Sequence, residues 1–403
     1  MPGRKAEAYS VADARLQAKR ILPRPVFDFI DGGAEDEVTL RWNLQAFEAT
    51  GLTPQNAVDV GRPSLSTTVL GQPVRFPVLL APCGLARVLH PDAEPGAARA
   101  AESAGTIAIV STASGRPLED FAAATSRGWF QLYFFGGRPG AERLVARASA
   151  SGFKALVVTI DTAVSGKRER DIRNGVAGAL SRDFRTAVRL GPSLAVRPQW
   201  LYRFVRDGMS VEFGNGTGIG QDNEAVVGDG LAEKRAAIIA HPPTWEDVEW
   251  LRQQWDRPLV VKGVLSADDA RRAVGAGADA VVVSNHGGRQ LDGAPASLDV
   301  LPEVVAAVGD QVEVYVDGGI RRGSHVVKAL AVGARAVLVG RPWLYGLAVG
   351  GEAGVRRVLD VLRDEMDLTM RLVGAPDVRQ LDAGLVRRRP PAPAIAAAAA
   401  DNP

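Results

Sequence analysis

The sequence predicts an α/β protein of the TIM (β/α)8-barrel class, and three observations lead to that class. Eight short runs rich in Val, Ile and Leu recur along the chain. These runs lack polar alternation, which is typical of parallel strands that are covered on both faces. A longer segment of helical character follows each run. Eight such alternations favour a closed barrel over a doubly wound sheet.

The predicted strands can be placed from their β-branched residues. In chain order they lie near residues 77–81, 107–111, 130–134, 155–160, 258–262, 279–284, 312–317 and 335–339. One intervening segment also carries helix-boundary signals. Ser266 is followed by Ala267, Asp268 and Asp269, which is an N-cap signature, and Gly275 or Gly277 is placed to end that helix.

Three regions lie outside this repeat. Residues 1–75 include an apparent helix over 11–22, and we expect this N-terminal helical extension to cap the barrel bottom and reach its rim. Residues 163–243 form a long insertion after the fourth strand, which is typical of a lid or partner surface on the active-site side. We therefore expect one barrel domain over 1–386. The Pro- and Ala-rich tail over 387–403 is predicted to be disordered.

Composition excludes several classes of protein. With 403 residues, 46% of them hydrophobic and 23% charged, the chain is an ordinary globular sequence with a large core. Its 48 Lys and Arg nearly balance 46 Asp and Glu, so no nucleic-acid partner is expected. The single cysteine, Cys83, rules out an internal disulfide and suits a reducing compartment. No signal peptide or membrane span is apparent, so we expect a cytoplasmic protein.

Barrel enzymes carry their chemistry where the strands end. The sixth predicted strand ends in Ser284-Asn285-His286-Gly287-Gly288-Arg289. This loop offers a proton acceptor, His286, and a fixed cation, Arg289, at the same rim. Together these groups could take a proton from a carboxylate-bearing substrate while holding its charge.

The last two predicted strands end in Asp317-Gly318-Gly319-Ile320-Arg321 and in Gly340-Arg341. Glycines let backbone N–H groups approach an anion, and arginines donate paired hydrogen bonds to phosphate oxygens. Loops seven and eight are where barrels commonly hold phosphate. The alternative is that the glycines only form tight turns, but two Gly-Arg units on adjacent strands favour a phosphate site.

A second glycine-rich stretch does not support the same interpretation. Residues 214–220 read Gly-Asn-Gly-Thr-Gly-Ile-Gly, without the GxGxxG spacing. No strand precedes this stretch and no helix clearly follows it. We interpret it as a flexible linker.

The loop over 284–292, Ser-Asn-His-Gly-Gly-Arg-Gln-Leu-Asp, resembles the active-site segment of the FMN-dependent α-hydroxy-acid oxidases and dehydrogenases. Glycolate oxidase, lactate oxidase and mandelate dehydrogenase belong to that family. Residues 166–174 resemble another of its segments, Gly-Arg-Arg-Glu-x-Asp-Ile-x-Asn. The resemblance runs from about residue 10 to about residue 380. It implies a TIM barrel with FMN as cofactor and a homo-oligomer, commonly a tetramer.

The resemblance also implies roles for residues at the strand ends. His286 would be the catalytic base, paired with Asp161, and Tyr133 would hydrogen-bond the substrate or the transition state. Arg168 and Arg289 would bind the substrate carboxylate. Lys262 would lie beside N1 and O2 of the flavin and stabilise its reduced form. The residues matching the flavin site are Pro82, Cys83, Gly84, Ser111, Gln131, Thr159, Lys262, Ser284, Asp317, Gly318, Gly319, Arg321, Gly340 and Arg341.

Each role has a structural alternative. His286 could be a structural hydrogen-bonding residue, and Lys262 could extend its ammonium group to solvent. Arg168 could form a salt bridge within a solvated charge run, and Tyr133 could simply pack in the core. Asp161 at another strand end favours the catalytic interpretation of His286. The sequence predicts no metal site.

Two pocket positions depart from the family pattern. Phe29 stands where glycolate oxidase-like members carry a tyrosine that binds the substrate carboxylate, so one hydroxyl donor is missing. Ala113 stands in place of a bulky pocket tryptophan, which leaves room for a larger substrate side chain. We therefore expect an L-2-hydroxy acid with a bulky or aromatic side chain, oxidised to the 2-oxo acid. Cys83, where many relatives have threonine, is expected to pack against the flavin and not to be reactive.

Two other functions are compatible with the sequence. One is a tailoring oxidase acting on an amine, a peptide or another biosynthetic intermediate, which the open pocket favours and the two arginines oppose. The other is a non-redox phosphate-binding barrel or an inactive binding protein. The electron acceptor could be dioxygen, a quinone or a carrier protein. For the Arg- and Trp-containing stretch over 197–206, a lid surface is favoured over membrane docking.

Overall fold

A computed structural model describes residues 8–174, 196–209, 213–215 and 240–388. Within them, eight parallel strands form one sheet in the order β4-β11-β10-β9-β8-β7-β6-β5. The gap between β4 and β5 is closed by a bridge, in which the Leu80 N–H donates to the Ile107 carbonyl at 2.9 Å. The strands are β4 (Val78–Leu80), β5 (Ile109–Ser111), β6 (Trp129–Leu132), β7 (Ala155–Thr159), β8 (Leu259–Val264), β9 (Ala280–Val283), β10 (Glu313–Val316) and β11 (Ala336–Val339).

This arrangement confirms the predicted TIM barrel, and every predicted strand agrees with an observed one to within two residues at either end. The strands read as continuous apolar runs because both of their faces are buried. In β9, Ala280 and Val282 belong to the cluster inside the barrel. Val281 and Val283 belong to the outer cluster, between the strands and the helices.

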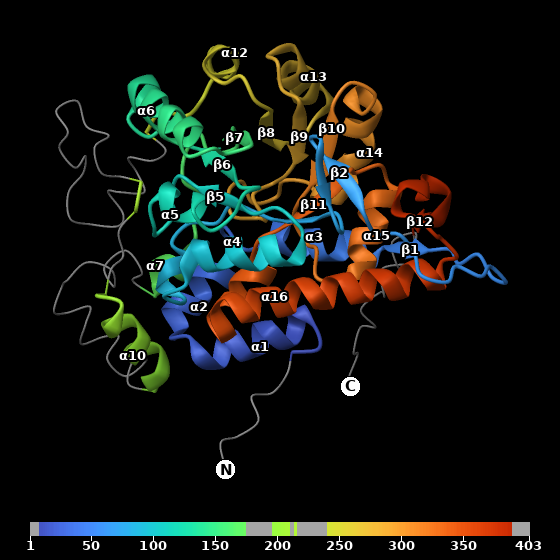
Figure 1. Cartoon of the computed structure of the whole chain (residues 1–403), viewed down its shortest axis with the longest axis horizontal. Coiled ribbons are helices and arrows are strands. Elements are labelled where there is room, and N and C mark those ends of the chain that lie inside the picture. The colour runs from blue at the N-terminus through green and yellow to red at the C-terminus, as the bar shows by residue number, and fades with distance from the viewer. Residues whose placement is uncertain (1–7, 175–195, 210–212, 216–239, 389–403) are drawn as a thin grey trace, which may run out of the picture.

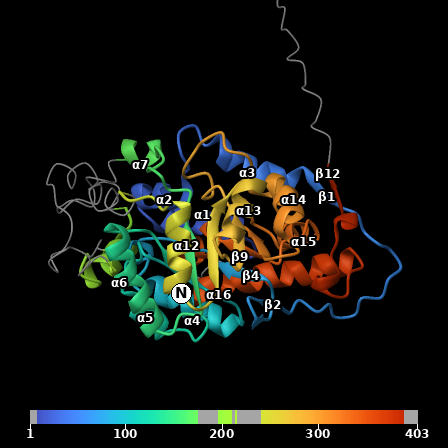
Figure 2. The same cartoon turned by 90° about the horizontal axis from the view of Figure 1, so that it is seen from above.

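Helices surround the strands, as Figures 1 and 2 show. They are α4 (Ala93–Ala104), α5 (Leu118–Ala122), α6 (Gly137–Ala150), α12 (Trp245–Gln254), α13 (Ala267–Gly275), α14 (Ser297–Val308), α15 (Gly323–Ala331) and α16 (Arg341–Leu372). The predicted boundaries of α13 are confirmed. Ser266 Oγ accepts the Asp269 N–H at 3.1 Å, and the helix ends at Gly275, two residues before Gly277, whose φ is +90°.

The N-terminal extension contacts both ends of the barrel. It contains α1 (Val11–Ile21), α2 (Arg24–Asp31), α3 (Val38–Glu48) and the hairpin β2 (Thr67–Val69) to β3 (Gln72–Val74). From the hairpin, Val69 and Val74 join the apolar cluster inside the barrel, so this segment closes the bottom as expected. The other end of the extension reaches the rim, where Phe29 and Ile30 line a cavity. α1 lies alongside α16 (Figure 1).

The expected start of a disordered tail at Arg387 is wrong. Residues Val386–Arg388 form β12, which pairs antiparallel with β1 (Thr50–Leu52). Arg387 lies opposite Gly51, and Arg388 also forms an ion pair with Asp299. Two consecutive arginines carry no strand signal of their own, so only the distant partner strand explains their conformation. Residues 389–403 lie outside the described residues.

Short segments of the insertion are also described. These are α7 (Glu169–Arg173), α10 (Pro198–Arg206) and residues 213–215. The remaining elements are three 3-10 helices, η1 (Ala86–Val88), η2 (Val378–Gln380) and η3 (Ala383–Leu385). None of the described helices has both the length and the apolar character needed to cross a membrane.

Candidate active site

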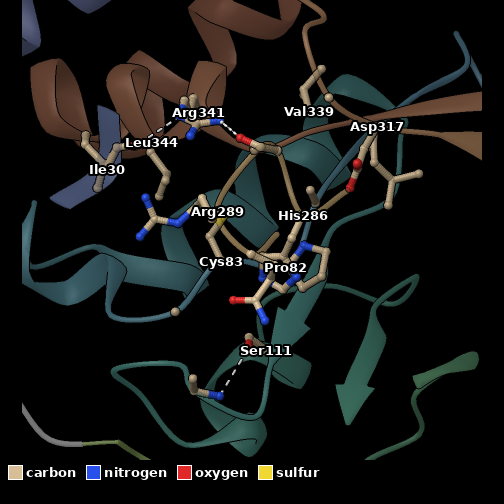
Figure 3. A pocket seen from close by; sticks show the side chains of 18 of the residues that line it. Ile30, Pro82, Cys83, Ser111, His286, Arg289, Asp317, Val339, Arg341 and Leu344 are labelled. Atoms are coloured by element: carbon tan, nitrogen blue, oxygen red, sulfur yellow. Dashed lines mark hydrogen bonds between the residues drawn. The ribbon is translucent and has the colours of Figure 1, made fainter. Parts of the chain in front are cut away.

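A cavity opens at the carboxyl ends of the barrel strands (Figure 3). Its lining brings together residues on or after all eight barrel strands with others from α2, α16 and the insertion. The space between the lining atoms is about 1330 Å³ when the open mouth is included.

The polar wall of the cavity follows from the two-residue repeat of the strands. Ile109 and Val260 belong to the apolar cluster inside the barrel, and Ser111 and Lys262 lie two residues further along the same strands. Alternate residues of a strand share a face, so the later residue also points inward, one layer closer to the carboxyl ends. The inward positions of this upper layer are Ser111, Gln131, Thr159, Lys262, Ser284, Asp317 and Gly340.

His286 and Asp161 meet at this end although 125 residues separate them. His286 Nδ1 lies 2.9 Å from Asp161 Oδ1. The carboxylate therefore fixes the imidazole ring and leaves Nε2 as the nitrogen that can accept a substrate proton. This contact is the pairing that the sequence predicted.

The backbone at His286 is constrained in a way that is uncommon for a residue with a side chain. Its φ is +57°, in the left-handed region, and Gly287 and Gly288 follow with φ of +65° and +72°. The His286 N–H donates to Ser284 Oγ at 3.1 Å. Backbone strain of this kind, held in place by its surroundings, is concentrated at functional sites.

Electrostatics keep the pair ready to accept a proton. Burial, aided by the positive charges of Lys262 and Arg168, lowers the pKa of His286 even though Asp161 acts in the opposite direction. Burial alone would raise the pKa of Asp161, but His286 and Lys262 outweigh it and the pKa falls below its ordinary value. At neutral pH the imidazole is thus neutral and the carboxylate ionised.

Two neighbouring groups keep their protons. Burial raises the pKa of Tyr133 to about 12, and Asp161 adds to that effect, so its hydroxyl is a hydrogen-bond donor at neutral pH. Burial also raises the pKa of Cys83 to about 12, which keeps this thiol protonated and weakly nucleophilic. The expectation that Cys83 is not reactive is in line with this environment.

Lys262 is buried, with 4% of its surface exposed, and its ammonium group is held by two partners. Nζ donates to Ser284 Oγ at 2.9 Å and lies 3.2 Å from Asp317 Oδ2. Burial alone lowers the pKa of Lys262, but Asp317, Asp161 and Tyr133 outweigh it and raise that pKa above its ordinary value. The side chain is therefore a fixed positive charge in the wall of the cavity, and it does not extend to solvent.

The two arginines of the expected carboxylate clamp both line the cavity. Arg168 Nε donates to the Arg289 carbonyl at 3.4 Å, which joins the insertion to the loop after β9. The Arg289 guanidinium donates to the Gly32 carbonyl at 2.8 Å and lies 5.5 Å from the centre of the Phe29 ring. Phe29 thus supports the clamp through a cation–π contact, although it has no hydroxyl to donate.

The two phosphate candidates differ in their contacts. Arg341 donates to the carbonyls of Ile30, Gly32 and Gly287 at 2.9–3.1 Å, so it connects α2 to the loop after β9. Arg321 is partly buried, and among the described residues its guanidinium donates one hydrogen bond, to the Ile320 carbonyl, and forms no salt bridge. Burial lowers the pKa of Arg321 to about 10, as expected for a cation that lacks a counter-ion.

Several buried polar atoms in the same region also lack a partner among the described residues. They are Gln131 Nε2, Thr159 Oγ1 and Asp317 Oδ1, all on or directly after barrel strands. Buried polar groups are nearly always hydrogen-bonded, so orphans of this kind indicate a missing partner. A polar ring system with hydroxyl groups and a phosphate would satisfy both these atoms and Arg321. The residues therefore fit FMN.

Most of the residues singled out in the sequence line this one cavity. Asp161, Gln131, Thr159 and Ser284 lie behind the lining, where they contact it or face its base. The lining residues that sequence reasoning did not single out include Leu85, Thr162, Ser165, Phe213, Gln290 and Leu344. Gln290 stands inside the recognised motif, and its Nε2 donates to the Asp161 and Val164 carbonyls at 2.9 Å. Phe213 carried no signal, because its segment has no motif and no strand beside it.

Comparisons with known proteins show which family the chain belongs to. The model of the family described as FMN-dependent dehydrogenase matches residues 18–388. An L-lactate oxidase from Nostoc sp. is 44% identical over 370 residues, covering 91% of this chain and 94% of that protein. A pre-mycofactocin synthase from Mycobacterium tuberculosis is 42% identical over 383 residues, covering 93% and 94%.

Among solved structures, a monotopic membrane protein, (S)-mandelate dehydrogenase, superposes with a TM-score of 0.87 at 39% identity, covering 94% of this chain and 99% of that chain. A model match over nearly the whole described chain, together with relatives above 40% identity at full length, is decisive for family membership. The chain therefore belongs to the FMN-dependent dehydrogenase family and is an oxidoreductase with FMN as its cofactor.

Proposed function

We propose that this protein oxidises an L-2-hydroxy acid with a bulky or aromatic side chain to the corresponding 2-oxo acid. The observation that carries the proposal is the meeting of the His286–Asp161 pair with Arg168 and Arg289 in one cavity. A base and two carboxylate-binding cations are the groups that this reaction requires of the protein. A lactate oxidase among the relatives supports the same substrate class.

In the proposed reaction, Arg168 and Arg289 bind the substrate carboxylate, and His286 Nε2 accepts a proton from Cα or from the hydroxyl group. Asp161 stabilises the imidazolium that forms. The substrate loses two electrons and two protons: His286 takes one proton, and bound FMN would accept the two electrons and the second proton. Lys262 and Arg321 place positive charge along the cofactor site, with Arg321 for the phosphate, while Tyr133 donates a hydrogen bond to the substrate.

Anaerobic titration of the FMN-loaded protein tests this proposal. The flavin absorbance should bleach with (S)-mandelate and phenyllactate, and less efficiently with glycolate, because Ala113 leaves space that a short substrate does not fill. Better turnover of glycolate than of the two aryl acids defeats the side-chain assignment. No bleaching by any 2-hydroxy acid defeats the proposed reaction itself.

A second candidate is an oxidase that acts on an amine or a peptide-derived intermediate. The missing hydroxyl at Phe29 and the small Ala113 favour it. The presence of both Arg168 and Arg289 in the cavity opposes it. Bleaching by amines but not by hydroxy acids in the same titration supports this candidate. Membership of an FMN-dependent dehydrogenase family removes the support for a non-redox barrel.

The partners of the second half-reaction belong to the same proposal. Electrons leave to dioxygen, a quinone or a carrier protein, and stopped-flow reoxidation of the reduced enzyme with each acceptor separates the three. We further infer a cytoplasmic homo-oligomer, most simply a tetramer. Light scattering tests the assembly, and cell fractionation tests the location against the membrane attachment of the mandelate dehydrogenase neighbour.

A further inference from the structure

A short segment of the insertion, Phe213 to Asn215, brings one side chain to the active-site cavity. Phe213 is buried, with 8% of its surface exposed, and lines the cavity directly. Asn215 is fully buried. The sequence suggested a flexible linker from Gly214 onward, and at Gly214 and Asn215 that interpretation is wrong.

Hydrogen bonds fasten this segment to the loop after β5. Asn215 Oδ1 accepts the Leu118 N–H at 2.8 Å. Its Nδ2 lies 3.0 Å from Ser114 Oγ and 3.2 Å from the Thr112 carbonyl, and it donates to both. A buried amide whose donor and acceptor are both satisfied holds one orientation, because any movement would leave polar groups unpaired.

Gly214 adds a backbone contact that only glycine permits. Its N–H donates to the Ser114 carbonyl at 2.9 Å. A Cβ atom at this position would lie 2.2 Å from the Arg116 carbonyl carbon, so no other residue fits without moving the loop. Ser114 directly follows Ala113, and Gly214 directly follows Phe213. The two cavity residues therefore enter the site from the same side.

A second anchor attaches α10 to the same rim. Asp207, which follows α10, accepts from Arg87 Nε at 2.7 Å and from Arg116 Nη2 at 2.9 Å. Trp200 Nε1 donates to the Val88 carbonyl at 2.9 Å. The loops after β4 and β5, which bring Cys83, Gly84 and Ala113 to the cavity, thus hold the insertion at two places.

The space beside Ala113 is bounded by apolar groups. On one side Gly84 packs so closely that a Cβ atom there would lie 2.8 Å from the Ala113 carbonyl oxygen. Phe213 offers a ring with no polar atom, and rings prefer other rings in offset or edge-to-face contact. The carboxylate clamp lies elsewhere, at Arg289 over the Phe29 ring.

We propose that Phe213, positioned by Asn215, is the specificity-determining residue for the substrate side chain, and that the compartment between Phe213 and Ala113 takes an aryl ring. This inference rests on the proposed function and narrows it from bulky to aromatic substrates. It also gives residues 213–215 a defined role, as a fixed wall of the active site.

The experiment compares Phe213→Ala and Phe213→Leu with the unaltered holoenzyme. The control is Phe204→Leu, because Phe204 stacks on Trp200 in the same insertion but does not line the cavity. Anaerobic flavin reduction is measured with (S)-mandelate and with L-lactate. Phe213→Ala should raise the apparent Kd for mandelate about tenfold or more while changing that for lactate less than about threefold, and Phe213→Leu should fall between. Asn215→Ala should raise the apparent Kd for mandelate as Phe213→Ala does, because Phe213 is then no longer held in position.

A binding measurement decides the inference even if no hydroxy acid is oxidised. Phenylacetate and propionate, which lack the hydroxyl group, are titrated against the oxidised FMN spectrum of each variant. The Phe213 variants should lose affinity for phenylacetate and keep that for propionate, with FMN content unchanged. If the Phe213 substitutions change the affinities for phenylacetate and propionate equally, or change neither, the proposed role of Phe213 is wrong. Failure of the wild-type holoenzyme to oxidise any hydroxy acid overturns the proposed function instead.

Discussion

His286 Nδ1 and Asp161 Oδ1 lie 2.9 Å apart, and each follows a different strand of the barrel. The contact exists because β7 and β9 end at the same face, separated only by β8. Asp161 therefore sets the tautomer of His286 from two strands away. A ring held in this way presents Nε2 to the cavity without reorganisation during the reaction.

Replacing Asp161 with Asn should slow the reductive half-reaction about 10²- to 10⁴-fold, the range for loss of acid–base catalysis. The isosteric amide keeps the shape of the site but does not stabilise an imidazolium. Stopped-flow anaerobic reduction measures the rate, and bound FMN should remain stoichiometric. The double variant with His286→Asn should be little slower than either single variant, since the two residues act as a unit. If the losses in rate of the two single variants add up in the double variant, the two residues act independently.

The pH dependence should follow the neutral form of His286. Because burial lowers the pKa of His286, the base form predominates above a midpoint that lies below the ordinary value of 6.5. The rate of flavin reduction should therefore rise with pH through this midpoint and level off above it. In Asp161→Asn the midpoint should move to lower pH, since Asp161 raises the pKa of His286. A midpoint above 7 in the unaltered enzyme is incompatible with this assignment.

Lys262→Met should destabilise the protein as well as slow it. The change leaves the Asp317 carboxylate buried beside an apolar chain, and breaking a buried pair in this way costs about 3–5 kcal/mol. Thermal unfolding should show a lower Tm than in the unaltered holoenzyme. The double variant with Asp317→Asn should recover part of that Tm but not the rate, because the fixed positive charge is still missing. Recovery of both the Tm and the rate would show that Lys262 takes no part in the reaction.

Arg170 connects the segment that carries Arg168 to the N-terminal extension. It forms ion pairs with Glu37 and, at 3.3 Å, with Asp31. Arg170→Ala should raise KM for a 2-hydroxy acid about tenfold with little change in kcat, because Arg168 is no longer held toward the substrate carboxylate. Arg173→Ala is the matched control, since Arg173 is 73% exposed and pairs within its own helix. An equal effect of the two substitutions would exclude a positioning role for Arg170.

Much of this fold could be predicted from the sequence, because β-branched runs covered on both faces leave an unmistakable pattern. The strand containing Ala280–Val283 is an example, with every side chain buried. The polar residues of the site were also recognisable, since they stand at the ends of those runs and within the motif around His286. Their convergence follows from the barrel itself.

The contacts that escaped prediction all depend on distant parts of the chain. Arg387 and Arg388 became strand residues only through pairing with β1. Asn215 is held by backbone groups of the loop after β5, about which its own neighbours in sequence say nothing. Arg341 was expected to face a phosphate, and its three hydrogen bonds to carbonyls could not be foreseen from a Gly-Arg pair.

The pairing of β1 with β12 has a consequence for biosynthesis. β1 leaves the ribosome early, whereas β12 is among the last parts of the described chain to be made. The part of the cavity lining near Phe29 also depends on residues that are translated late, since Arg289 and Arg341 donate hydrogen bonds to the carbonyl of Gly32. We therefore expect nascent chains to remain without a prosthetic group until translation is nearly complete. A premature stop codon that removes only the last strand should then leave a colourless polypeptide without FMN, which chaperones and proteases would clear.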